Sequence, residues 1–238
     1  MSKSIRLQKI LADCGVGSRR TMEQAILDGR VSLNGMIVTE MGIKADISAD
    51  TILLDGKPIN VCASEQKIYA ALNKPLGVVS TASDEQNRPK ITDFLPEEYG
   101  RLFPVGRLDI NTSGLILLTN DGEWANRISH PKYETEKEYI TILDRDLTAP
   151  EASRISRGVD IGGFTTSPAK VIRKAPKTYS VAIHEGRKRQ VRLMFAAVGA
   201  KVTQLTRIRI KNLHLGTLEP GKHRLLSEEE VQNLSKPD

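Results

Sequence analysis

Residues 114–118, Gly-Leu-Ile-Leu-Leu, constrain the fold most, because a short apolar run bounded by turn residues is typical of a strand buried on both faces. The loop before this run contains a lone acidic residue, Asp109, between Arg107 and a hydroxyl-rich segment. A loop that leads into a buried strand is held by a rigid element, which suits a positioned carboxylate. Asp109 is therefore the candidate catalytic residue. The alternative is that it only turns the chain, since Asp in a Gly-rich loop often hydrogen-bonds its own backbone.

Strand-like runs dominate the chain beyond residue 67 and outnumber the helices. They cover residues 68–72, 77–81, 114–119, 138–143, 170–172, 179–183 and 201–210. In residues 179–183 the alternation of apolar and polar positions indicates an antiparallel strand with one solvated face. We predict an α+β fold whose catalytic domain is built on a mixed, largely antiparallel sheet with flanking helices.

A small N-terminal α/β module is predicted ahead of this sheet. Apolar spacing favours helices over residues 5–14 and 18–28, and Asn34-Gly35 predicts a hairpin turn between two short strands. Residues 51–54 supply a further strand. We predict three parts: an RNA-binding domain at residues 1–60, a linker at 61–66 and a catalytic domain at 67–238.

Cations on or beside the two predicted helices favour contact with RNA. Because Ser18-Arg19-Arg20 opens a helix, backbone N–H groups and two guanidiniums can converge on one phosphate. The alternative is an ordinary solvated helix surface. The predicted RNA contacts of this module are Arg6, Lys9, Arg19, Arg20 and Arg30.

Positive charge is concentrated near the C-terminal third of the chain. The net charge is +6, and residues 170–211 hold twelve Lys or Arg but one acidic residue, Glu185. Such a stretch is expected to attract a polyphosphate backbone. Three adjacent cations within it cannot all point into one small pocket, so they predict phosphate contacts. These cations are Arg187, Lys188 and Arg189.

Several classes of protein are disfavoured by composition. The two cysteines and four histidines are scattered without ligand-like spacing, and the chain has no Gly-rich phosphate loop. No apolar run is long enough to cross a membrane, and the N-terminus lacks the apolar core of a secretory signal. We therefore expect no metal, no cofactor and no membrane partner, and a cytoplasmic protein. The sequence does not determine the oligomeric state, for which a monomer is the default expectation.

Four stretches, in order and over nearly the whole chain, carry a resemblance to a known family. They are residues 73–80 (Asn-Lys-Pro-Leu-Gly-Val-Val-Ser), 106–122 with Asp109, 137–139 (Lys-Glu-Tyr) and 185–194. This ordered set resembles the motifs of the bacterial ribosomal RNA pseudouridine synthases of the RsuA/RluB/RluF type. The N-terminal module resembles the small RNA-binding domain of the ribosomal-protein S4 type.

The resemblance implies that the chain breaks the bond between a uridine's base and its ribose, turns the uracil and rejoins it through a ring carbon. The target base has to be flipped out of the RNA. Asp109 is then the catalytic residue, acting as nucleophile or as base. The resemblance implies four further roles. Tyr139 stacks on the uracil, Arg107 stabilises the displaced RNA, Leu193 lines the pocket and Arg192 forms an ion pair with Asp109. We also expect Lys74 and Pro75 to shape the neighbouring turn, and we count Lys74 among the RNA contacts.

The substrate is expected to be ribosomal RNA of the large subunit, because the form of the second motif looks closer to large-subunit enzymes. A partly assembled ribosomal particle is a second form of the same substrate. The alternatives are a small-subunit enzyme, a non-catalytic RNA-binding factor of ribosome assembly, and a basic metabolic enzyme that does not bind RNA. The last predicts no salt-sensitive RNA binding.

Overall fold

The computed structural model describes residues 4–59 and 66–236. Contacts divide the chain into two compact units, Met1–Lys67 and Ile68–Asp238. The predicted linker at residues 61–66 lies outside the described residues except for Gln66, so the predicted bounds of linker and domains stay predictions. Both units combine helices with sheets, which confirms the predicted fold class.

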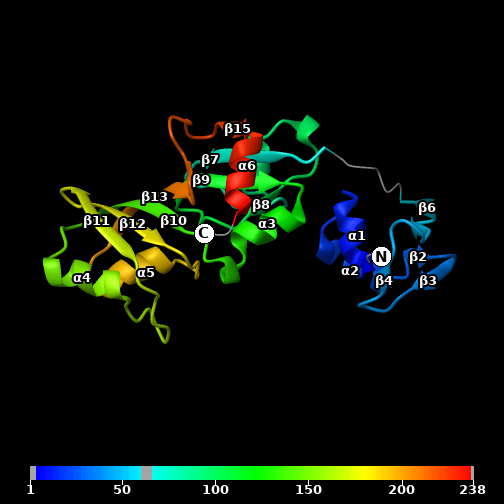
Figure 1. Ribbon diagram of the computed structural model, residues 1–238, viewed down its shortest axis with the longest axis horizontal. Helices are drawn as coiled ribbons and strands as arrows, with labels where there is room; N and C mark the ends of the chain where they lie inside the picture. The colour runs from blue at the N-terminus through cyan, green and yellow to red at the C-terminus, as the bar shows by residue number, and fades with distance from the viewer. Residues whose placement is uncertain (1–3, 60–65, 237–238) are drawn as a thin grey trace. The chain divides into compact units, whose positions relative to one another are not determined.

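The first unit joins two short helices to a small antiparallel sheet with the strand order β3-β2-β5-β6 (Figure 1). Its elements are β1 (Ile5–Arg6), α1 (Leu7–Asp13), α2 (Arg19–Leu27), β2 (Val31–Leu33), β3 (Met36–Val38), β4 (Lys44–Ala45), β5 (Ile52–Leu54) and β6 (Lys57–Pro58). The helix α2 begins after Ser18, whose Oγ accepts a hydrogen bond from the N–H of Thr21 at 3.0 Å. The predicted hairpin is confirmed, because Asn34 and Gly35 both adopt positive φ, 51° and 83°.

The second unit is a nine-stranded sheet with helices packed against it (Figure 1). Its strands are β7 (Tyr69–Lys74), β8 (Phe103–Val105), β9 (Ser113–Thr119), β10 (Lys137–Leu143), β11 (Lys170–Ala175), β12 (Thr178–Ile183), β13 (Val202–Ile210), β14 (Leu213–His214) and β15 (His223–Leu225). Its α-helices are α3 (Gly122–Ser129), α4 (Ala149–Arg157), α5 (Gln190–Ala196) and α6 (Glu228–Ser235). Its 3-10 helices are η1 (Ile91–Phe94), η2 (Glu97–Tyr99) and η3 (Pro131–Tyr133).

The sheet of the second unit is mixed. Its strand order is β11-β12-β10-β13-β9-β7-β15, with β14 on β13 and β8 on β9. The central pair, β9 and β13, is parallel, and the other described pairs are antiparallel. The predicted mixed, largely antiparallel sheet is thereby confirmed.

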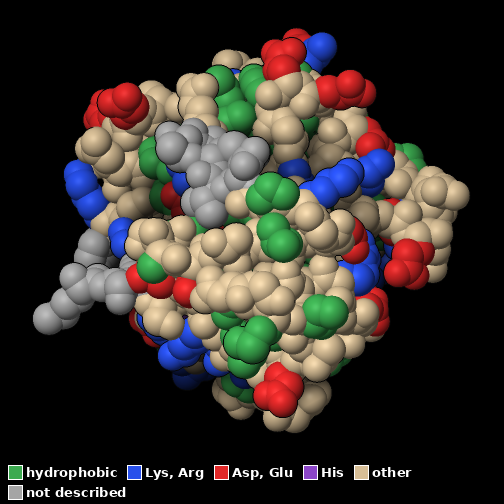
Figure 2. Space-filling model, turned by 90° about the vertical axis from the view of Figure 1, so that its right-hand side faces the viewer, with side chains coloured by type: hydrophobic (Ala, Val, Ile, Leu, Met, Phe, Trp, Pro, Cys, Tyr) green, Lys and Arg blue, Asp and Glu red, His purple; other side chains and the backbone are tan. Residues whose placement is uncertain are grey.

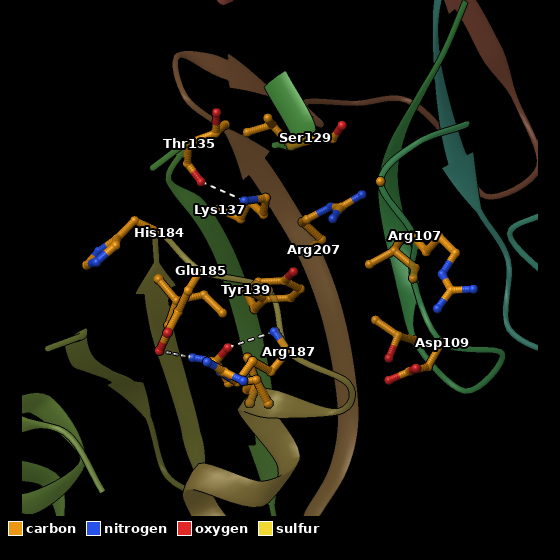
Figure 3. A pocket seen from close by; sticks show the side chains of 18 of the residues that line it. Arg107, Asp109, Ser129, Thr135, Lys137, Tyr139, His184, Glu185, Arg187 and Arg207 are labelled. Atoms are coloured by element: carbon orange, nitrogen blue, oxygen red, sulfur yellow. Dashed lines mark hydrogen bonds between the residues drawn. The ribbon is translucent and has the colours of Figure 1, made fainter. Parts of the chain in front are cut away.

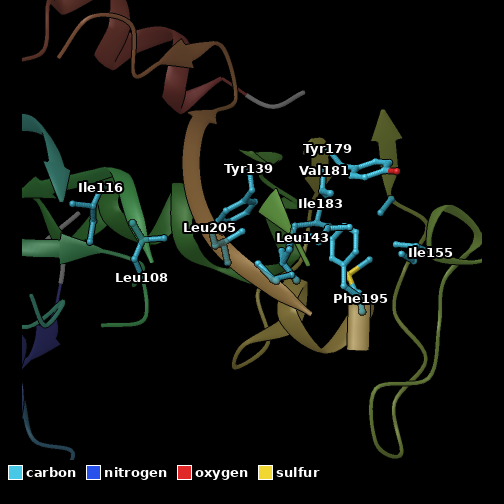
Figure 4. Packing of buried hydrophobic residues seen from close by; sticks show 14 of the residues in the cluster. Leu108, Ile116, Tyr139, Leu143, Ile155, Tyr179, Val181, Ile183, Phe195 and Leu205 are labelled. Carbon is cyan, nitrogen blue, oxygen red and sulfur yellow. The ribbon is translucent and has the colours of Figure 1, made fainter. Parts of the chain in front are cut away.

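The strand β9 is buried on both faces, as its sequence predicts. Ile116 and Leu118 belong to the core that α4 and α5 cover, which includes Phe195 (Figure 4). Leu115 and Leu117 belong to a second core, which α3 and α6 cover. The loop that carries Asp109 therefore leads into a strand enclosed on both faces.

Two predictions about strands are wrong. Residues 77–81 form a turn and a single bridge between Val79 and Lys90, because Pro75 has no N–H for a ladder and Gly77 turns the chain with a φ of 80°. The strand β12 has no solvated face, since Ser180 and Ala182 are as buried as their apolar neighbours. Ser180 is satisfied inside the fold by donating its hydroxyl to Glu138 at 2.5 Å.

Candidate active site

A pocket of about 350 Å³ lies in the second unit, where the loop after β8 meets β10, β13 and the loop before α5 (Figure 3). Arg107 and Asp109 come from the first of these loops, and Tyr139 comes from β10. Arg187 and Arg189 come from the loop before α5. The second and third motifs and the Lys-x-Tyr element, which are far apart in the sequence, thus meet in one pocket.

Backbone contacts hold the loop that carries Asp109. The Ser80 hydroxyl donates to the carbonyl of Leu108 at 2.8 Å and accepts from its N–H at 3.1 Å. The N–H of Gly77 donates to the carbonyl of Ile110 at 2.8 Å. The turn of the first motif, residues 73–80, therefore holds the loop of the second motif that carries Asp109.

The Asp109 side chain itself is left unpaired. The N–H of Thr112 donates to the backbone carbonyl of Asp109, at 3.0 Å, and not to its carboxylate. Among the described residues this carboxylate forms no hydrogen bond or ion pair, and it is half-buried at the pocket wall. The alternative reading, in which the Asp side chain stabilises its own turn, therefore does not fit the structure.

The predicted ion pair between Arg192 and Asp109 is wrong. The guanidinium of Arg192 donates to the carbonyl of Asn111 at 2.7 Å and to that of Val202 at 2.9 Å. These bonds tie the Asp109 loop to α5 and β13, and among the described residues no hydrogen bond or ion pair joins this guanidinium to the carboxylate. Burial lowers the pKa of Arg192, the charge of Arg189 lowers it further, and the charge of Asp109 raises it.

Two more predicted site residues do not lie where their roles require. Lys74 cannot bind RNA, because its side chain is 0% exposed and its ammonium donates to the carbonyls of Pro75 and Val78 at 2.9 and 2.8 Å. Its predicted part in shaping the neighbouring turn is consistent with these bonds. Leu193 is 37% exposed on α5 and is not among the residues that line the pocket.

Other predicted residues do border the pocket. Tyr139 lies on its wall with 8% of its surface exposed, and Arg107 is exposed at its edge. Arg187, Lys188 and Arg189 are all exposed there, and the Arg187 guanidinium lies 3.2 Å from the ring centroid of Phe164. Their predicted contacts with uracil and phosphate stay predictions.

Sequence reasoning missed the cations of the pocket floor. Lys137 and Arg207 line the pocket, but the sequence placed the first only in a motif and the second only in a basic stretch. The usable signal was spacing, because Arg207 lies two residues after the buried Leu205 on β13 and therefore shares its inward face.

In residues 4–59 and 66–236, no group of three His, Cys, Asp or Glu side chains could hold a metal ion. No helix in this part of the chain has the length and apolar character of a membrane span.

The pKa of Lys137 falls to about 8, first because it is buried and then because of the charge of Arg207. A lysine whose pKa is lower in the folded than in the unfolded state destabilises the fold while it is charged, and this cost disappears as the pH rises from about 8 to about 10.5. The free energy of unfolding of Lys137→Met, relative to that of the wild type, should therefore be higher at pH 7 than at pH 10. Urea unfolding followed by Trp124 fluorescence measures the difference. The exposed Lys170→Met is the matched control, and an equal pH trend there would contradict the assignment.

The matches to known proteins follow the same division of the chain. Residues 68–197 match the family model of RNA pseudouridylate synthases, and residues 5–52 match the S4 domain. The chain therefore belongs to the RNA pseudouridylate synthase family, a family of isomerases, and carries an N-terminal S4 domain.

Particular relatives cover nearly all of the chain. The ribosomal large subunit pseudouridine synthase B of Bacillus subtilis is 41% identical over 96% of this chain and 95% of its own length. The protein of the same name from Pseudomonas aeruginosa is 39% identical over 97% of this chain and 62% of its own. A crystal structure of a pseudouridylate synthase is 34% identical, with a TM-score of 0.71 over 97% of this chain and 100% of its own.

Proposed function

We propose that this enzyme isomerises one uridine of large-subunit ribosomal RNA to pseudouridine, with Asp109 as the catalytic residue. The observation that carries the proposal is the Asp109 carboxylate, which forms no hydrogen bond or ion pair among the described residues and shares its pocket with Tyr139. The names of the Bacillus subtilis and Pseudomonas aeruginosa relatives support the large subunit as substrate. A small-subunit substrate and a non-catalytic role in ribosome assembly are the competing functions.

The pocket chemistry suits a flipped uracil. Its volume of about 350 Å³ can take a nucleobase that has left the helix, and flipping costs a few kcal/mol that contacts in the pocket have to offset. Tyr139 offers a ring for stacking, and Arg107 at the edge offers a cation for the displaced RNA. Asp109 then attacks the ribose as a nucleophile or removes a ribose proton as a base.

The experiment is isomerisation of tritium-labelled RNA by the wild-type protein. Uridine labelled at C5 releases its label when C5 becomes the new point of attachment, so release measures the reaction. We expect release from one position of large-subunit RNA, either as a free transcript or in a partly assembled particle. Release from small-subunit RNA alone would move the assignment to the small subunit. No release from either RNA in either form, with salt-sensitive binding intact, would favour the assembly factor.

The first unit is proposed to bind RNA through α1 and α2. Figure 2 shows cations interspersed with acidic side chains on one face of the molecule. The cations of the two helices that are available to RNA are those that no acidic side chain already binds. Arg30 donates to Asp55 at 2.8 and 2.6 Å, and Lys9 lies 3.9 Å from Asp13. The exposed cations with no ion pair among the described residues of α1 and α2 and their ends are Arg6, Arg19 and Arg20.

The double variant Arg19→Gln, Arg20→Gln is expected to weaken RNA binding and to lower the salt dependence of binding. Each lost phosphate contact lowers the slope of log affinity against log salt by about 1, so the double variant should lose roughly 2. Filter binding of ribosomal RNA between low and moderate salt measures the slope. Arg30→Gln is the matched control, since Asp55 already binds this guanidinium. A larger loss in Arg30→Gln than in the double variant would contradict the proposed surface.

A further inference from the structure

Arg207 is a buried cation that the fold leaves partly unsatisfied. It is 2% exposed, and its Nε donates to the carbonyl of Leu115 at 2.7 Å. Its Nη2 is buried and has no hydrogen-bond partner among the described residues, and none of the ion pairs found there includes it. A buried charge without a carboxylate is costly, so such a residue points to a ligand group that completes it.

The sheet register aims Arg207 at the pocket. Arg207 pairs with Tyr139 across β10 and β13, and directly opposite residues place their side chains on the same face. A bulge follows, so that Arg209 pairs with Glu138 and lies on the other face. There Arg209 is bound by Glu138 at 2.7 Å and by Glu136. Figure 3 shows the Arg207 guanidinium extending from β13 toward the loop with Arg107 and Asp109.

The surroundings of Arg207 are positive and rich in unused polar atoms. Its charge helps to lower the pKa of both Lys74 and Lys137 to about 8, although burial is the larger cause. The hydroxyls of Thr112 and Thr135, which also line the pocket, are buried and lack hydrogen-bond partners among the described residues. The cations and the unpaired hydroxyls of the pocket therefore suit a ligand that carries oxygen atoms and gains negative charge.

The uracil ring meets this description during the proposed reaction. When the C1′–N1 bond breaks, the electron pair of the bond stays with N1, and the uracil becomes an anion whose charge spreads to O2 and O4. The anion forms whether Asp109 bonds to C1′ or takes a ribose proton. The uracil then turns and C5 bonds to C1′, which either breaks the Asp109–C1′ bond or is accompanied by return of the ribose proton from Asp109. C5 finally loses its proton and N1 gains one, so atoms and charge balance.

We propose that Arg207 is a catalytic residue, which donates a hydrogen bond from Nη2 to a carbonyl oxygen of the flipped uracil and stabilises the detached uracil anion. The inference rests on the proposed function. A backbone phosphate fits the guanidinium less well, because Arg207 lies at the floor beside Tyr139, whereas the exposed Arg187, Lys188 and Arg189 stand at the edge. Preorganised donors aimed at developing charge act most strongly where water is excluded.

The test compares Arg207→Met with Arg209→Met in single-turnover isomerisation at saturating RNA. Both variants remove one guanidinium from β13, but only the Arg207 side chain faces the pocket. We expect Arg207→Met to slow the reaction by roughly 100- to 1000-fold with little change in RNA affinity, and Arg209→Met to stay within a few-fold of wild type. Arg207→Lys keeps a charge in the pocket and should recover part of the rate, and it also serves if Arg207→Met does not fold.

A substrate with a better leaving group separates catalysis from structure. In 5-fluorouridine the fluorine withdraws electrons and stabilises the uracil anion, so the rate loss in Arg207→Met and Arg207→Lys should be smaller than with uridine. Chromatography of digested RNA follows this substrate. Wild-type rates in folded Arg207 variants would overturn the inference, as would a parallel loss of RNA affinity or an equal defect on both substrates. An inactive wild type would instead overturn the proposed function.

Discussion

Asp109→Asn is expected to lower the rate of uridine isomerisation by at least about a thousandfold, because an amide can act neither as an anionic nucleophile nor as a base. The same change should hardly affect folding. The carboxylate of Asp109 has no hydrogen bond or ion pair to lose among the described residues, and Asn has nearly the same volume. We expect a change in the free energy of unfolding within about 0.5 kcal/mol.

Tritium release and RNA affinity, measured side by side, decide this prediction. Asp160→Asn is the matched control, because the side-chain oxygen of Asp160 accepts from the N–H groups of Gly162 and Gly163, and an amide oxygen can still do so. Asp160 lies outside the pocket and its variant should keep wild-type activity. Activity in Asp109→Asn above a tenth of wild type would show that another group performs the chemistry.

The parts of the site that the sequence could predict are those in which local pattern and burial agree. A short apolar run bounded by turn residues favours a strand buried on both faces, so β9 and the loop before it could be predicted from residues 106–118. A lone acid in that loop could be proposed for the same reason. Likewise the turn at Asn34-Gly35 follows from the positive φ that both residues tolerate.

The parts that the sequence could not predict depend on register and on which partner a side chain selects. A regular strand would place Arg207 and Arg209 on the same face, and only the bulge between them sends one to the pocket and the other to Glu138. Similarly, charge complementarity predicted that Arg192 would pair with the Asp109 carboxylate, but its guanidinium donates to a backbone carbonyl of the same loop. Lys74 looked like a surface cation, but adjacent carbonyls satisfy its ammonium in the core.

Gly114→Ala is expected to destabilise the second unit by more than about 4 kcal/mol, because it acts where the two parallel strands meet. An added Cβ would lie 2.2 Å from the backbone oxygen of Arg207 and 2.7 Å from its nitrogen. These are backbone atoms of the paired strand β13, so relief requires β9 and β13 to separate. Gly114 also has a φ of 104°, which L side chains rarely adopt.

Gly77→Ala separates the two causes. Gly77 has a comparable φ of 80°, but an added Cβ would meet nothing within 4 Å, so its cost should be the backbone term alone, about 1 kcal/mol. Trp124 is the single tryptophan of the chain and lies in the second unit, so its fluorescence in urea reports the unfolding of that unit. If Gly114→Ala unfolds no more easily than Gly77→Ala, then β9 and β13 have room between them, and Arg207 is not held against the pocket floor as tightly as its role requires.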